Sequence, residues 1–205
     1  MALSFLALGD SYTIGEAVAV EGRWPHQLAA ALRAQGVDLA DPQTIATTGW
    51  TTDELGAGID AAAPQGPFGF VSLLIGVNNQ YRGRPLDEYR HQFEALLQRA
   101  IGFAGGDAGR VLVLSFPDWG ATPFGAGSGR DLARVEIETD EFNAAAEVIS
   151  TQRVVAFVDI TDISRTHGTD PAMIAGDGLH PSARMYALWA ERALPVATQL
   201  LQRTD

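Results

Sequence analysis

The sequence contains no cysteine. Without thiols, the protein has no disulfide scaffold, no thiolate metal site and no cysteine nucleophile. Basic residues are also few. The chain has 14 of them and 25 acidic residues, which gives a formal net charge of −11. No basic stretch interrupts this acidity, and both nucleic-acid grooves and anionic membrane surfaces are bound through clustered Lys and Arg. We therefore expect neither nucleic acid nor a membrane as a partner.

Long apolar runs are missing as well. No stretch of the chain approaches the ~20 apolar residues that a membrane-spanning helix needs. The N-terminal run Leu3–Leu8 is apolar, but it lacks the basic start and the cleavage site of a signal peptide. We interpret it as a first strand and expect a cytoplasmic protein, while the earlier removal of a longer leader stays open.

The composition is that of an ordinary globular domain. Of the 205 residues, 46% are hydrophobic and 19% are charged, which excludes wholesale disorder. A domain of this length buries about 70% of the surface of its unfolded chain, so it can form a hydrophobic core without disulfides or a structural metal. No linker and no internal repeat is visible, and residues 1–205 are predicted to form a single domain.

Strand and helix patterns alternate along the chain. Expected strands are Leu3–Leu8, Thr44–Ala46, Phe70–Ile75, Val111–Leu114 and Val154–Val158. Expected helices are Trp24–Ala34, a segment that begins at Thr51 with Glu54 at capping-box spacing, Leu86–Ala100, Phe142–Ile149, and a last helix that Ser182 caps and Pro195 kinks or divides. The glycine-rich stretch from Pro117 to Arg130 is expected to be a long loop. The alternation predicts an α/β fold with a five-stranded parallel sheet covered on both faces.

Polar residues follow each expected strand. Parallel α/β sheets bind their ligands beyond the carboxyl ends of the strands, so these residues are expected to converge on one edge. The segments are Gly9-Asp10-Ser11, Thr48-Gly49-Trp50, Gly76-Val77-Asn78-Asn79, Pro117-Asp118-Trp119-Gly120 and Asp177-Gly178-Leu179-His180-Pro181. Each segment alone contains residues that are common in turns and indicates no particular function. Their joint order favours a site with a serine nucleophile, an amide donor and an Asp–His pair.

Four of these segments, those that contain Ser11, Gly49, Asn78 and His180, resemble the sequence blocks of the SGNH hydrolases, also called the GDSL esterase/lipase family. The resemblance runs from Phe5 to Pro181 and so covers nearly the whole chain. Two positions depart from the family pattern: Tyr12 stands where leucine is usual, and Asn79 stands where aspartate is commoner. Neither position has a catalytic role in the family, so the departures concern the local shape of the site.

The resemblance implies a three-layer α/β/α, flavodoxin-like fold and a complete set of site residues. Ser11 would be the nucleophile, His180 the general base, and Asp177 the residue that orients the imidazole. The oxyanion hole would consist of the backbone N–H groups of Ser11 and Gly49 and the side-chain amide of Asn78. Glycine at 49 is explained here by a close backbone approach that tolerates no Cβ. No metal and no cofactor is expected.

Several other residues lie in or next to these segments. Asp10 is interpreted as structural, with its carboxylate bonded to nearby loop backbone. Trp50 and Trp119 follow strand ends, and substrate contact is weighed evenly against core packing for both. For Tyr81 and Arg82 a solvated loop is favoured over the mouth of the site.

The function expected from the resemblance is a serine esterase that acts on small molecules with short-chain acyl ester groups. Carbohydrate O-acetyl esterases, thioesterases and lysophospholipases of the same family are the alternatives. An alternative of another class is a non-catalytic flavodoxin-like binding module, disfavoured because the first strand-end turn has one glycine rather than a phosphate-cradling cluster. A metal site at His167, near Asp162 and Asp170, is disfavoured because no paired histidine spacing supports it. The oligomeric state is left open.

Overall fold

The structure, a computed structural model, describes residues 2–202 and contains one five-stranded sheet. Its strands are β1 (Leu3–Gly9), β2 (Leu39–Ala46), β3 (Phe70–Leu74), β4 (Val111–Leu114) and β5 (Ala156–Val158). All neighbouring strands pair in parallel, in the order β2-β1-β3-β4-β5. The expected α/β fold class with a parallel five-stranded sheet is confirmed. Residue 1 and residues 203–205, the ends of the predicted 1–205 domain, lie outside the described part.

The position of each strand in the sheet explains how visible it is in the sequence. β3 and β4 are buried at every residue, so they read as uninterrupted apolar runs. β2 lies at the edge, and its residues alternate between half-buried and exposed over most of its length. It also contains Pro42, which an edge strand tolerates. This polar edge character is why only its last three residues, Thr44–Ala46, were expected as a strand.

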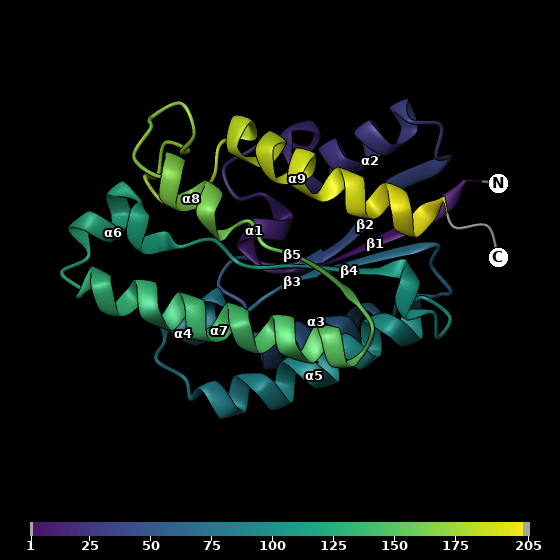
Figure 1. The fold of residues 1–205 in the computed structure, drawn as a ribbon, viewed down its shortest axis with the longest axis horizontal. Coiled ribbons are helices and arrows are strands. Elements are labelled where there is room, and N and C mark those ends of the chain that lie inside the picture. Colours follow the sequence, from purple (N-terminus) through teal and green to yellow (C-terminus); the bar gives the residue numbers. More distant parts are fainter. Residues whose placement is uncertain (1, 203–205) are drawn as a thin grey trace.

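Helices form a layer on each face of the sheet (Figure 1). One layer contains α2 (Trp24–Ala34), α8 (Thr161–His167) and α9 (Ala183–Leu201), and the other contains α3 (Thr52–Ala62), α4 (Val77–Tyr81), α5 (Leu86–Phe103) and α7 (Leu132–Gln152). The short helices α1 (Ser11–Ile14) and α6 (Pro123–Gly127) and the 3₁₀ turns Val20–Gly22, Ala108–Arg110 and Trp119–Ala121 complete the fold. The three-layer α/β/α arrangement expected from the resemblance is therefore present.

The two expected helix starts are confirmed. The Ser182 side chain accepts a hydrogen bond from Met185 N–H at the start of α9. At the start of α3, the Thr51 side chain and the Glu54 side chain form the reciprocal capping box. Both caps satisfy backbone N–H groups that the first helical turn leaves without partners.

Three local expectations differ from the structure. Pro195 does not divide the last helix, because α9 runs continuously through this exposed residue, and the backbone carbonyl that loses its donor lies on the solvent side. The stretch from Pro117 to Arg130 contains a 3₁₀ turn and α6 rather than being irregular throughout. The last strand starts at Ala156 instead of Val154, because Val154 has a left-handed φ of 58° and is exposed.

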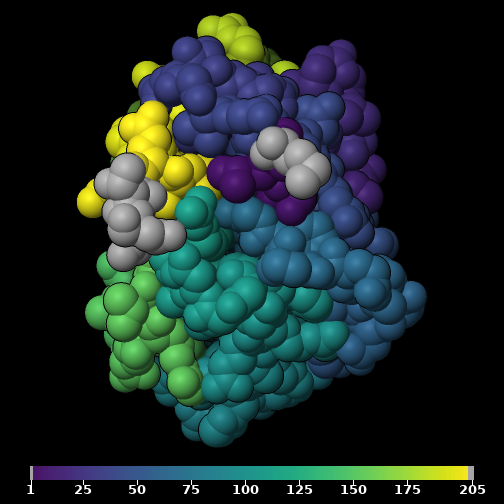
Figure 2. Space-filling model, turned by 90° about the vertical axis from the view of Figure 1, so that its right-hand side faces the viewer, coloured from purple at the N-terminus to yellow at the C-terminus, as the bar shows by residue number. Residues whose placement is uncertain are grey.

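The two ends of the parallel sheet have different surroundings. Figure 2 looks onto the end at which the strands begin, where the start of β1 (purple) lies close to the last part of α9 (yellow). The strands end on the opposite side, at the left of Figure 1, where α1, α4 and α6 are found. Within residues 2–202, no helix has the length and the apolar character of a membrane span.

Candidate active site

The first site segment is the turn that joins β1 to α1. Asp10 is the N-cap of α1, and its Oδ1 accepts a hydrogen bond from the Tyr12 backbone N–H at 3.0 Å. The structural role expected for Asp10 is thus confirmed. Complete burial raises the pKa of the Asp10 carboxyl to about 7, although hydrogen bonds from backbone N–H groups act in the opposite direction. Ser11 follows as the first residue of α1, and 5% of its surface is exposed.

The Asp–His pair is formed in the segment before α9. Asp177 Oδ2 lies 2.6 Å from His180 Nδ1, and Asp177 Oδ1 accepts the backbone N–H groups of Leu179 and His180, each at 2.9 Å. Partial burial alone would raise the pKa of Asp177, but these hydrogen bonds outweigh it and lower the pKa below its ordinary value. An ionised carboxylate beside Nδ1 favours the tautomer with its hydrogen there, which leaves Nε2 as an acceptor.

Ser11 and His180 line the same cavity, which has a volume of about 180 Å³. The other residues that line it are Tyr12, Thr48, Gly49, Val77, Asn78, Tyr81, Trp119, Phe124 and Leu179. No hydrogen bond joins the Ser11 hydroxyl to the His180 ring among the described residues. Such bonds are often long in enzymes without substrate and tighten when the substrate binds.

Tyr12, the first departure from the family pattern, is a buried wall of this cavity. Its ring centroid lies 5.6 Å from that of His180 and 6.0 Å from that of Trp189 in α9. The tyrosine therefore packs between the histidine and the helix that follows it. At this position the departure adds an aromatic contact beside the His180 imidazole.

Gly49 lies in a tight turn after β2. The Trp50 N–H donates to the Thr47 carbonyl at 3.2 Å, and Gly49, the third residue of the turn, has a φ of 87°. A type II turn requires a φ near +80° at that position, which favours glycine. A Cβ on Gly49 would meet only Arg82 Nη2, at an ordinary 3.7 Å. In this structure, therefore, the backbone angle and not the space for a Cβ accounts for the glycine, which corrects the expected reason.

Asn78 is positioned by the turn after β3. This turn needs glycine at 76, because φ is 138° and a Cβ would lie 2.7 Å from the Tyr89 ring. The Asn78 amide nitrogen donates to the Trp50 carbonyl at 2.9 Å. An amide nitrogen carries two hydrogens, so the second can be directed at the cavity that Asn78 lines.

Asn79, the second departure, supports the same loop from behind. Its side-chain oxygen accepts the Thr52 N–H at 3.1 Å, and its amide donates to the Thr52 hydroxyl at 2.7 Å. Asn79 is fully buried, so both bonds are shielded from water. The amide makes two bonds, one as acceptor and one as donor, where a carboxylate would only accept.

The two tryptophans expected as substrate contacts have different positions. Trp119 lines the cavity, and its indole N–H donates to Gln80 Oε1 at 2.8 Å. Trp50 does not line it, since its ring packs against Gly58 of α3, where a Cβ would lie 2.2 Å from the indole. Trp50 therefore has a packing role, and the structure gives its side chain no place in the cavity wall.

Two aromatic residues of the cavity were missed by sequence reasoning. Tyr81, expected in a solvated loop, ends α4 and lines the cavity, with its ring centroid 5.2 Å from that of Trp119. Phe124 lies in α6, inside the segment expected to be a loop. Its N–H donates to the Gly178 carbonyl at 2.9 Å, which ties α6 to the Asp177–His180 segment. No local pattern signals this contact, because it joins segments more than fifty residues apart.

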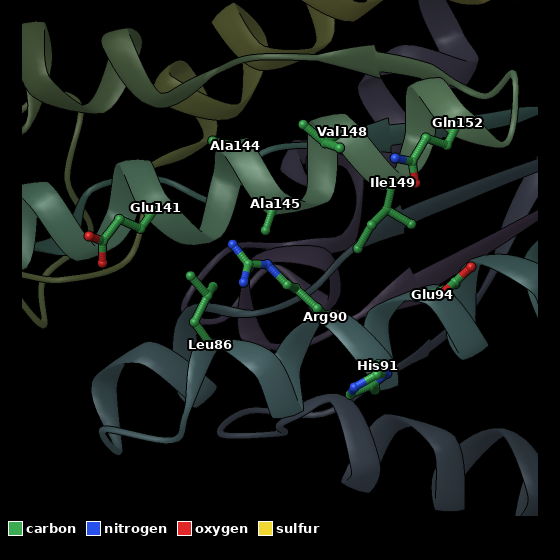
Figure 3. Close-up of a pocket in the computed structure, with 10 residues that line it drawn as sticks. All are labelled: Leu86, Arg90, His91, Glu94, Glu141, Ala144, Ala145, Val148, Ile149 and Gln152. Carbon is green, nitrogen blue, oxygen red and sulfur yellow. The ribbon is translucent and has the colours of Figure 1, made fainter.

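A larger groove exists elsewhere, but it lacks the chemistry of this site. It has a volume of about 620 Å³ and lies between α5 and α7 (Figure 3). Its lining consists of Leu86, Arg90, His91, Glu94, Glu141, Ala144, Ala145, Val148, Ile149 and Gln152. It contains no serine, and it is not at the strand ends. Among residues 2–202, no group of three or more His, Asp or Glu side chains is arranged to hold a metal ion.

Comparison with known proteins agrees with this architecture. Residues 7–188 match the GDSL-like Lipase/Acylhydrolase family, whereas no curated protein sequence matches the chain. The solved structure of TesA has a TM-score of 0.73 at 18% identity, covering 97% of this chain and 99% of that one. The psychrotrophic esterase EstA from Pseudoalteromonas sp. gives 0.73 at 16%, with 98% and 99% covered. Axe2, an acetylxylan esterase from Geobacillus stearothermophilus, gives 0.72 at 18%, with 95% and 94% covered.

Proposed function

Because the chain belongs to the GDSL-like lipase/acylhydrolase family, we propose that it is a serine esterase that hydrolyses small carboxylic esters. The observation that carries the proposal is the 2.6 Å contact between Asp177 and His180, in a cavity that Ser11 also lines. A serine hydroxyl is a weak nucleophile until a neighbouring base accepts its proton. The Asp–His pair supplies that base in an oriented tautomer.

The proposed reaction has two steps. Ser11 Oγ attacks the ester carbonyl while His180 Nε2 takes the hydroxyl proton, and the same proton then goes to the departing alcohol. An acyl group remains on Ser11. A water molecule then attacks this acyl-enzyme with His180 again as base, which releases the acid and restores the serine. Asp177 stabilises the imidazolium formed in each step.

Negative charge develops on the carbonyl oxygen in both steps. We assign its stabilisation to the backbone N–H groups of Ser11 and Gly49 and the side-chain amide of Asn78. All three residues line the cavity that holds the nucleophile. The type II turn directs the Gly49 N–H, and the bond to the Trp50 carbonyl orients the Asn78 amide.

The size of the cavity supports a small substrate. Its 180 Å³ is below the ~300–1,000 Å³ typical of sites for drug-sized ligands. Tyr81, Trp119 and Phe124 give part of its wall an apolar, aromatic character. Short-chain acyl groups fit this space, whereas the long chain of a lysophospholipid would have to extend beyond it.

A carbohydrate O-acetyl esterase is the second candidate, and one observation favours it. An acetyl group is the smallest common acyl group, and Tyr81 and Phe124 are partly exposed rings at the cavity on which a sugar could pack. A thioesterase would use the same residues. A panel of p-nitrophenyl esters of increasing acyl length, acetylated xylo-oligosaccharides and short acyl thioesters separates these substrates, with Ser11→Ala as the control.

A covalent probe tests the esterase proposal against a non-catalytic binding module. After treatment with a fluorophosphonate, intact-mass analysis should show one adduct that is lost in Ser11→Ala. The wild type should also hydrolyse p-nitrophenyl acetate. Absence of both the adduct and hydrolysis would exclude the esterase and favour the binding module.

Asn78→Ala tests the proposed oxyanion hole. Loss of one donor typically lowers kcat by about 10²–10³-fold, and we expect this range with a normally folded protein. Steady-state kinetics and a thermal unfolding curve measure the two quantities. A loss below about threefold would remove Asn78 from the oxyanion hole.

A further inference from the structure

The turn that contains Gly49 is held by side chains of α4 and of the residue that follows it. We propose that one of these, Arg82, is a positioning residue of the oxyanion hole. This inference rests on the esterase function proposed above. It assigns Arg82 a role through the Gly49 backbone rather than through contact with the substrate.

The central contact is a short hydrogen bond to the turn. Arg82 Nη2 donates to the Gly49 carbonyl at 2.6 Å. Arg82 comes four residues after Asn78, and residues at this spacing lie on the same face of a helix. Asn78 holds the next carbonyl, that of Trp50, at 2.9 Å. Two side chains from one helical turn thus anchor two successive peptide groups of the loop.

The guanidinium also connects this loop to the start of α3. Arg82 Nη1 lies 3.3 Å from Glu54 Oε2, and that oxygen accepts the Thr51 N–H at 2.9 Å. A planar guanidinium can bond two partners at once with little further loss of freedom, which a lysine ammonium does less well. Both partners of the ion pair are more than 40% exposed, so the pair itself contributes little to folding stability. The ion pair instead acts through geometry, because it helps to hold Arg82 in place beside the turn.

The position of the turn matters because it directs a donor. The N–H of Gly49 belongs to the central peptide group of the turn, and that group points in opposite directions in type I and type II turns. Asn78, the other donor from outside the nucleophile segment, sits on the helix turn that ends at Arg82. Arg82 therefore fixes the position of the Gly49 N–H relative to the side-chain amide of Asn78. Errors of ~1 Å in such an arrangement can cost ~10²-fold in rate.

The test uses Arg82→Ala, Arg82→Lys and a matched control, Arg84→Ala. Arg84 pairs with Asp53 and Glu88 in the same region, but it forms no hydrogen bond to Gly49 or Trp50. For Arg82→Ala we expect kcat to fall about tenfold, below the full loss of a donor, with KM within twofold and an unchanged unfolding temperature. Arg82→Lys should recover part of the rate through a single hydrogen bond. Arg84→Ala should keep the wild-type kcat.

A double-mutant cycle separates positioning from a general structural effect. In a Gly49→Ala background, where the turn no longer directs its donor, Arg82→Ala should cause less than a twofold further loss of kcat. An equal loss in both backgrounds, or a single-variant loss below twofold in an otherwise active enzyme, would overturn the inference and leave the esterase function intact. If the wild type neither hydrolyses esters nor takes a fluorophosphonate, the function and the inference both fall.

Discussion

At the scale of single residues, Gly49 combines an unusual backbone angle with free space. Its φ of 87° is left-handed, yet a Cβ would make only an ordinary contact with Arg82. For other residues the left-handed region costs ~1–2 kcal/mol, which a folded protein of this size can tolerate. A substitution here should therefore affect the turn more than the fold.

We predict that Gly49→Ala lowers kcat by about 10²-fold, because alanine favours a turn in which the central N–H points away from the cavity. The free energy of unfolding should fall by only ~1–2 kcal/mol. Steady-state kinetics and urea denaturation measure the two effects. Gly83→Ala is a matched control, since Gly83 also has a positive φ of 66° and nothing within 4 Å of a Cβ. It should lose similar stability and keep kcat, and an equal loss of kcat in both variants would contradict the prediction.

Asp10 is the second residue whose environment has a measurable consequence. Its pKa is about 7 in the folded protein and has its ordinary value, near 3.8, in the unfolded chain. Between these values the native state binds more protons than the unfolded state, so the free energy of unfolding falls as pH rises through this interval. Above about pH 7 both states are ionised, and this contribution no longer changes.

We predict that Asp10→Asn removes this pH dependence. Asparagine keeps the oxygen that accepts the Tyr12 N–H, but it has no charge to desolvate. Chemical denaturation at pH 5, 6, 7 and 8 should show the wild type losing a few kcal/mol relative to the variant as pH rises. Parallel curves for the two proteins would contradict the buried ionisation.

At the scale of elements, α9 shows how a helix tolerates an internal proline. Pro195 is exposed, while Trp189, Ala193 and Ala197 form the buried side of the same helix. The lost hydrogen bond therefore falls on the solvent side, where water can reach the carbonyl of Glu191. Packing of the apolar side against α2 and the sheet keeps the helix continuous.

We predict that Pro195→Ala stabilises the protein. The substitution restores one helical hydrogen bond, and the greater freedom of the unfolded chain offsets part of the gain, so the net effect should be ~1–2 kcal/mol. Urea denaturation measures the effect. Gln199→Ala, at another exposed position of α9, should change stability by only a few tenths of a kcal/mol. A loss of stability in Pro195→Ala would show that α9 is bent to suit the proline.

At the scale of the whole molecule, arginine side chains form ion pairs that connect elements distant in the sequence. The chain has no lysine, so all 14 of its basic residues are arginines. Arg165 of α8 bonds the nearly buried Asp118 carboxylate after β4 at 2.9 Å and Asp140 of α7 at 2.8 Å. It thereby joins helices from both layers to the segment that leads to Trp119. A forked guanidinium suits such bridges, and in a protein with a charge of −11 it also neutralises local acidic clusters.

We predict that Arg165→Ala lowers the free energy of unfolding by about 1–3 kcal/mol, because it leaves the Asp118 carboxylate without its cation. Equilibrium denaturation at neutral pH tests this. Arg90→Ala is the control, since Arg90 forms an exposed pair with Asp87 within α5, and its loss should have no measurable effect. Equal effects of the two substitutions would show that the bridge between layers adds nothing.

The sequence by itself determined the class of fold and the residues at the strand ends. Buried strands such as β3 and β4 are recognisable because burial on both faces demands continuous apolar runs. The order of the segments around Ser11, Gly49, Asn78 and His180 reflects the need for every strand end to face one edge. The contact of Asp177 with His180 follows from their spacing of three residues, which a single turn can close.

Only the tertiary structure decided which side chains form the cavity. Trp50 turns toward Gly58 and leaves the wall, whereas Phe124 enters it from a segment without a strand or long helix. The contacts of Arg82 with Gly49 and of Phe124 with Gly178 join segments that are distant in sequence. Such contacts depend on the packing of whole elements against one another, and local periodicity reports only which face of each element is apolar.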